Sequence, residues 1–118
     1  MELNGARISK AEAELDGHLY TAVLLELPNA CVAFISEGEL RMGTLAIAMP
    51  PGKNHPPGSI SAVVVGERFS FLTRLLAERL AISKGKITLL SLWAEGTEAE
   101  IGSRAMEMLK KLLAGGSP

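Results

Sequence analysis

The sequence predicts an α+β fold, a two-layer domain in which a six-stranded, mostly antiparallel sheet carries two helices on one face. Two observations lead to this prediction. Short segments that are apolar, or in which apolar and polar residues alternate, recur along the chain between turn residues, as is typical of strands. Two further segments carry apolar residues at helical spacing over about four turns each. With 118 residues, the chain has the length of a single domain, which we take to span residues 1–118.

The first four expected strands are joined by short connections, which favour antiparallel pairing. They are residues 7–15, 18–27, 30–36 and 40–49. Asp16-Gly17 predicts a tight hairpin between the first two strands. Pro28-Asn29 ends the second strand before the third begins, and Glu37-Gly38-Glu39 is a turn before the fourth. From Pro50 to Gly58, four prolines and two glycines in nine positions predict a loop.

A strand, a helix and another strand are expected next. Residues 60–65 form an apolar, β-branched run typical of a buried strand. From Phe69 onward, apolar residues recur at helical spacing, and Lys84 followed by Gly85 indicates the end of this helix. Residues 87–93 return to a strand pattern. A helix that joins two strands in this way usually packs back over the sheet they share.

The second helix is expected to begin at Thr97. The Thr97 hydroxyl and Glu100 have the spacing of a capping box. The apolar stripe of this helix consists of Ile101, Ala105, Met108, Leu109 and Leu112.

Two helices are too few for the apolar surface that these strands present. They cover roughly one face of a six-stranded sheet, because strands lie ~4.8 Å apart and helices 8–10 Å apart. Residues 31–35, 45–49 and 62–65 are nevertheless apolar at both alternating sets of positions. We therefore expect another copy or a related chain to pack on the second face, forming an obligate or near-obligate dimer. The alternative is a sheet that curls and buries this face itself.

Small side chains favour a close approach of two sheets. In strand 18–27 the odd positions are the more apolar set and the even positions are mixed in character. In strand 40–49 the odd positions are bulky and the even positions are small. We therefore predict a dimer interface containing Tyr20, Ala22, Leu24, Thr44, Ala46 and Ala48. The proline-rich loop is either a partner-binding segment or a mobile connection. In the first case, its binding residues would be Lys53, Asn54 and His55.

The pattern predicts neither catalysis nor a cofactor. Cys31 lies in an apolar strand, where a thiol behaves as a small hydrophobic group. His18 and His55 are far apart and lack the spacing of metal ligands. The isolated glycines form no phosphate-binding motif. We therefore expect a protein that is not an enzyme and that binds no metal and no organic cofactor.

Charge and hydropathy exclude further classes of function. The 12 basic and 13 acidic side chains are spread along the sequence, so a nucleic-acid partner is not expected. No apolar stretch approaches the ~20 residues that span a bilayer, so no membrane segment is expected. A lone cysteine and the absence of a signal-peptide pattern favour a cytoplasmic location.

Several short motifs occur in a particular order. Ile8-Ser9-Lys10 precedes the first hairpin, Arg41-Met42-Gly43-Thr44-Leu45 opens the fourth expected strand, and Val63-Val64-Val65-Gly66 leads into the first helix. A Leu- and Ala-rich helix, the strand from Ile87 and a final helix with Met106-Glu107 follow. This order resembles the proteasome assembly chaperone 3 family, with its Lys/Arg-Met-Gly-Thr-Leu and Val-Leu-Leu-Gly segments. The likeness extends from about residue 8 to residue 113.

The resemblance implies a non-enzymatic chaperone. Members of this family are small α/β domains that dimerise and hold proteasome α-type subunits while the α-ring of the 20S core particle assembles. The partner chain would be a second copy or a related chaperone. The sequence leaves two other hypotheses open: a dimeric scaffold of the roadblock or longin kind that regulates a GTPase, and a small-molecule enzyme that uses Cys31 or His55.

Overall fold

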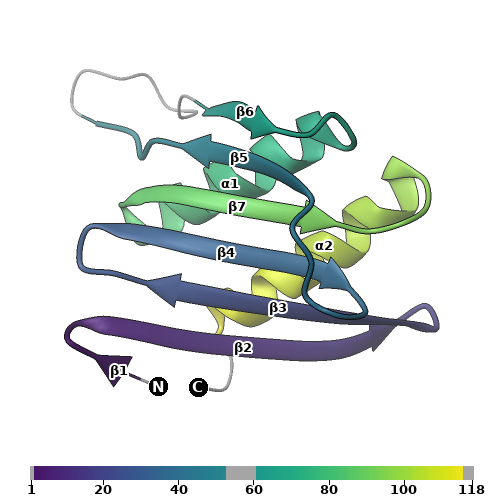
Figure 1. Cartoon of the computed structure of the whole chain (residues 1–118), viewed down its shortest axis with the longest axis horizontal. Coiled ribbons are helices and arrows are strands. Elements are labelled where there is room, and N and C mark those ends of the chain that lie inside the picture. The colour runs from purple at the N-terminus through teal and green to yellow at the C-terminus, as the bar shows by residue number, and fades with distance from the viewer. Residues whose placement is uncertain (1, 53–60, 116–118) are drawn as a thin grey trace.

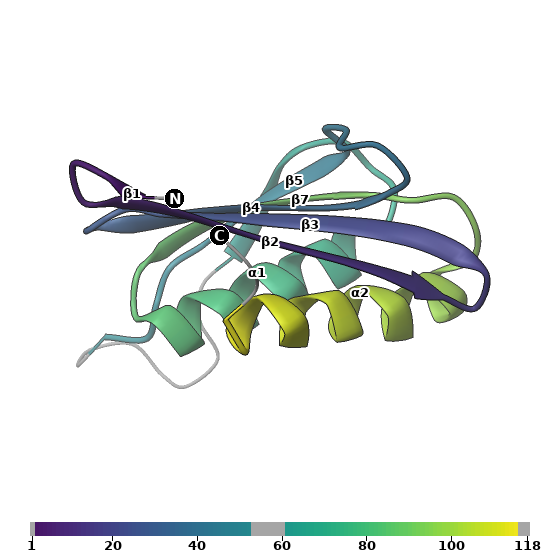
Figure 2. The same ribbon diagram turned by 90° about the horizontal axis from the view of Figure 1, so that it is seen from below.

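The computed structural model describes residues 2–52 and 61–115. Within these ranges the chain forms seven strands and two helices in two layers, with both helices on one face of a single sheet (Figures 1 and 2). The elements are β1 (Glu2–Leu3), β2 (Ala6–Leu15), β3 (His18–Glu26), β4 (Ala30–Glu37), β5 (Thr44–Ala48), β6 (Ser61–Val65), α1 (Ser70–Lys84), β7 (Ile87–Trp93) and α2 (Glu98–Leu113). The predicted two-layer α+β fold is confirmed. Neither described helix is long and apolar enough to cross a membrane.

The strand order is β1-β2-β3-β4-β7-β5-β6. Neighbouring strands are antiparallel except β4 and β7, which are parallel, so the sheet is mixed and mostly antiparallel. Two details differ from the sequence prediction. A two-residue strand, β1, precedes the six expected strands, and β5 begins only at Thr44 because residues 40–43 belong to the connection from β4.

The core lies between the sheet and the helices. α1 packs on β5, β6 and β7, and α2 packs mainly on β2 and β3. Every second residue of β3, β4, β5 and β7 points into this layer and is buried. Many of these residues are small, so the helices can approach the sheet closely. Leu76 and Leu80 of α1 and Ile101 and Met108 of α2 fill the space above them.

The start of α2 and the end of α1 lie where the sequence predicts them. The Thr97 hydroxyl oxygen accepts the Glu100 N–H at 3.3 Å, and the same hydroxyl donates to the Glu100 carboxylate at 2.8 Å. Gly85 follows α1 with φ 66°, and its N–H donates to the Ala81 carbonyl at 2.8 Å. This left-handed conformation is open to glycine without the steric penalty that a side chain would bring.

Glu26 at the end of β3 connects the sheet to the end of α1. Its two carboxylate oxygens lie 3.1 Å from the Lys84 and Lys86 ammonium groups. Lys86 also donates to the Leu27 carbonyl at 3.0 Å. The hydrogen bond from Lys86, followed by the interactions with Lys84, holds the pKa of the Glu26 carboxyl below its usual 4.5.

We expect Glu26→Gln to lower the free energy of unfolding at pH 7 by about 1 kcal/mol. Because the folded-state pKa of Glu26 is lowered, its contribution is complete above the unfolded pKa and is lost as the pH falls through the folded value. Urea unfolding between pH 7 and pH 3 measures this. The difference between wild type and variant should shrink toward pH 3, and a constant difference would contradict the assignment.

Candidate protein-interaction face

The sheet face opposite the helices, here called the uncovered face, consists of the alternate strand residues that point away from the core. The strand registers align these residues in rows across the sheet. One row is apolar on all six strands that it crosses: Ile8, Leu25, Val32, Leu89, Ile47 and Ala62. The next row contains Lys10, Val23, Phe34, Ser91 and Leu45.

The apolar side chains in the middle of the uncovered face are half-buried by their neighbours in the sheet. Val23, Val32, Phe34, Ile47 and Leu89 all belong to this class. In the described part of the chain, both helices lie on the other side of the sheet (Figure 2). The middle of this face is therefore a continuous apolar surface, and surfaces of this kind are typical of protein–protein interfaces.

The β2 end of the uncovered face is charged. Lys10, Glu12 and Glu14 are exposed there and are paired in register with Val23, Thr21 and Leu19 of β3. Charged residues near a sheet edge oppose pairing with further strands. This arrangement, an apolar centre beside a charged margin, resembles the core and rim of protein interfaces.

The connection between β4 and β5 crosses the end of β7 on this face (Figure 1). Ser36 accepts the Arg41 N–H at 2.9 Å, and Ser91 accepts the Gly43 N–H at 2.8 Å, so both buried hydroxyls have partners. The Arg41 guanidinium lies 4.8 Å from the centre of the Trp93 ring. The connection therefore covers the end of the uncovered face around Ser91 and Trp93, and it does not cover the apolar row through Val32.

The structure contradicts the predicted composition of the interface. Six residues that the sequence analysis assigned to it are at most 5% exposed and lie in the core beneath the helices: Tyr20, Ala22, Leu24, Thr44, Ala46 and Ala48. The strand residues alternate as predicted, but the set that was expected to face a partner is the set that faces the helices. A partner on the uncovered face would contact the odd-numbered positions of β3 and β5 instead. Lys53, Asn54 and His55 lie outside the described residues, so their assignment to partner binding stays a prediction.

A polar cluster joins the β2–β3 hairpin to α2. The buried Arg104 donates to Asp16 at 3.2 Å, and His18 Nδ1 lies 3.3 Å from a Glu37 carboxylate oxygen. The Tyr20 hydroxyl donates to the other Glu37 oxygen at 3.4 Å. Burial raises the pKa of Tyr20 above its usual value. These contacts join the two layers, so we assign the cluster a structural role; the buried Nη1 of Arg104 has no hydrogen-bond partner among the described residues.

Cys31 is buried in the core, and this burial raises the pKa of its thiol. The sulfur is therefore protonated near neutral pH and inaccessible, the opposite of what a nucleophilic cysteine requires. Among the described residues, no group of three or more His, Cys, Asp or Glu side chains is placed to hold a metal ion.

Comparison with known protein families found no match, and no curated protein matched the sequence. The fold, however, is similar to a solved one. A chain in the crystal structure of a novel chaperone complex for yeast 20S proteasome assembly superposes with a TM-score of 0.68. The match covers 93% of this chain and 94% of the other at 7% identity. The likeness at this identity is one of fold, and it extends over nearly the full length of both chains.

Proposed function

We propose that this chain is a non-enzymatic chaperone that binds proteasome α-type subunits while the α-ring of the 20S core particle assembles. It would act in the cytoplasm as a dimer, paired through the uncovered face with a second copy or a related chaperone. The observation that carries this proposal is the continuous apolar row across that face. The shared fold with a chain from a chaperone complex for yeast 20S proteasome assembly supports the assignment to this process.

The uncovered face has the properties that face-to-face packing of two sheets requires. Sheets pack about 10 Å apart with interdigitating side chains. Phe34, Val32 and Leu89 would supply the bulky apolar contacts near the centre. Lys10 and Glu12 at the margin would remain hydrated and contribute more to orientation than to affinity.

Co-expression of the tagged full-length chain with proteasome α-type subunits tests the proposed client. We expect at least one α-type subunit to co-purify and β-type subunits to be absent from the eluate. Recovery of a GTPase in place of any α-type subunit would favour the dimeric scaffold of the roadblock or longin kind. Failure to recover an α-type subunit under any condition would contradict the proposal.

A further inference from the structure

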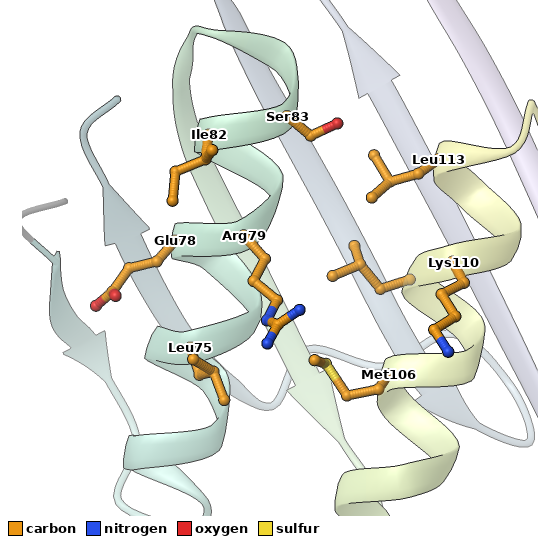
Figure 3. A pocket seen from close by; sticks show the side chains of 9 residues that line it. Leu75, Glu78, Arg79, Ile82, Ser83, Met106, Lys110 and Leu113 are labelled. Carbon is orange, nitrogen blue, oxygen red and sulfur yellow. The ribbon is translucent and has the colours of Figure 1, made fainter. Parts of the chain in front are cut away.

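A groove runs between α1 and α2 on the outer surface of the helix layer (Figure 3). It has a volume of about 470 Å³. Its apolar lining consists of Leu75, Ile82, Met106, Leu109 and Leu113. Met106 and Leu113 are only half-buried, and Ile82 is 51% exposed, so part of this apolar lining is open to solvent.

The charges that line the groove are mainly positive. Arg79 and Lys110 are exposed, project from facing helices, and form no ion pair with any residue in the described ranges (Figure 3). The carboxylate of Glu78 instead accepts a hydrogen bond from Ser61 of β6. The groove therefore combines an apolar floor with two cations that lack an acidic partner.

We propose that this groove binds an acidic amphipathic helix of a partner protein. Leu75 and Ile82 on α1 are seven residues apart, as are Met106 and Leu113 on α2, so each side offers apolar contacts over about two turns, or ~10 Å. Helices that dock in such grooves place apolar anchors at positions i, i+3 or i+4, and i+7. Glutamate or aspartate beside these anchors would face Arg79 and Lys110.

A second copy of this chain fits the groove poorly. A two-fold contact would bring Arg79 and Lys110 of one copy close to the same cations of the other, which costs free energy. The groove is lined by α1 and α2, and these helices lie on the opposite side of the sheet from the uncovered face (Figure 2). Pairing through that face and binding of a helix in the groove can therefore occur together. The inference deepens the proposed function. It rests on that function only where it identifies the helix as part of a protein that this chain binds as a chaperone.

Two synthetic peptides test the charge requirement. Both are fluorescein-labelled amphipathic helices with leucine at the anchor positions, flanked in one by glutamate and in the other by lysine. By fluorescence anisotropy, we expect the full-length chain to bind the glutamate peptide about tenfold more tightly than the lysine peptide. Binding of the glutamate peptide should weaken as salt rises. Absence of binding, or equal binding of both peptides, would overturn the proposal.

Charge reversal in the protein gives the complementary test. Lys110→Glu should weaken binding of the glutamate peptide about threefold, and Arg79→Glu/Lys110→Glu together about tenfold, with the preference turned toward the lysine peptide. Lys111→Glu is the matched control, because this exposed neighbour does not line the groove, and it should leave binding unchanged. An equal effect of Lys110→Glu and Lys111→Glu would overturn the proposal. So would a lower oligomeric mass of the double variant, since a second copy would then occupy the groove.

These experiments separate the two proposals. If α-type subunits co-purify with the chain but neither peptide binds in the groove, the groove assignment fails and the proposed function remains. If the glutamate peptide binds as expected but no α-type subunit is recovered, the groove remains and the identity of the client fails.

Discussion

The double substitution Val32→Glu/Leu89→Glu is expected to abolish pairing through the uncovered face while the domain stays folded. The two residues are paired in register on β4 and β7, near the middle of the apolar row, and both are half-buried in the isolated chain. In the dimer, both carboxylates would be buried away from water. The apolar row contains no basic side chain that could pair with them. Burying unpaired charges costs several kcal/mol, so the dissociation constant should rise at least ~100-fold.

Sedimentation equilibrium measures this effect. A homodimer has twice the chain mass of 12.5 kDa, and the variant should sediment at the mass of a single chain. Phe71→Glu is the control, because this side chain is 69% exposed and belongs to α1, a helix that lies on the opposite side of the sheet from the uncovered face (Figure 2). It should keep the wild-type mass. Retention of the homodimer mass by Val32→Glu/Leu89→Glu, with an intact circular dichroism spectrum, would contradict pairing through this face.

Much of the architecture could be predicted from the sequence because local patterns determine it. Asp16-Gly17 fixes a tight hairpin, Gly85 ends α1, and the Thr97 hydroxyl caps α2. The sequence also shows that two helices cannot cover both apolar faces of the sheet, because this conclusion needs only the number of expected helices and strands. The hairpin and the two helix ends depend on residues that are close together in the chain.

Which face of the sheet lies under the helices was predicted wrongly, although the sequence contains a signal for it. The Asp16-Gly17 hairpin aligns Glu14 with Leu19 and Lys10 with Val23, so the charges of β2 share a face with the bulky odd positions of β3. That face cannot be the one that two helices bury. The assumption that small residues mark a sheet–sheet contact failed because small residues also let helices approach the sheet, as Ala46 does beneath α1.

The fourth expected strand was too long for a non-local reason. Residues 40–43 have a sequence compatible with a strand, but β7 lies between β4 and β5, so the chain must cross β7 before β5 can begin. β7 belongs to a distant segment of the sequence and pairs in parallel with β4. The turn at Glu37-Gly38-Glu39 therefore does not return the chain to a position beside β4.

Gly43→Ala should be among the most destabilising small substitutions in this chain, because the crossing connection touches β7 there. A Cβ atom at Gly43 would lie 2.0 Å from the Leu92 carbonyl oxygen and 2.8 Å from the Trp93 Cα. Both are backbone atoms of a strand in the interior of the sheet, so neither can move aside without disturbing the strand pairing. We expect a loss of about 3 kcal/mol and a decrease in Tm of roughly 10 °C.

Gly102→Ala provides the matched control for this prediction. A Cβ at Gly102 in α2 would meet no atom within 4 Å apart from its chain neighbours and the nearby backbone of its own helix, and alanine favours a helix interior over glycine by about 0.5–1 kcal/mol. The same chemical change should therefore raise the Tm at one position and lower it at the other when both are measured at one protein concentration. Equal stability of Gly43→Ala and wild type would mean that the connection can leave Ser91 and β7 at little cost. The end of the uncovered face beneath the connection, including Trp93, would then also be available to a partner.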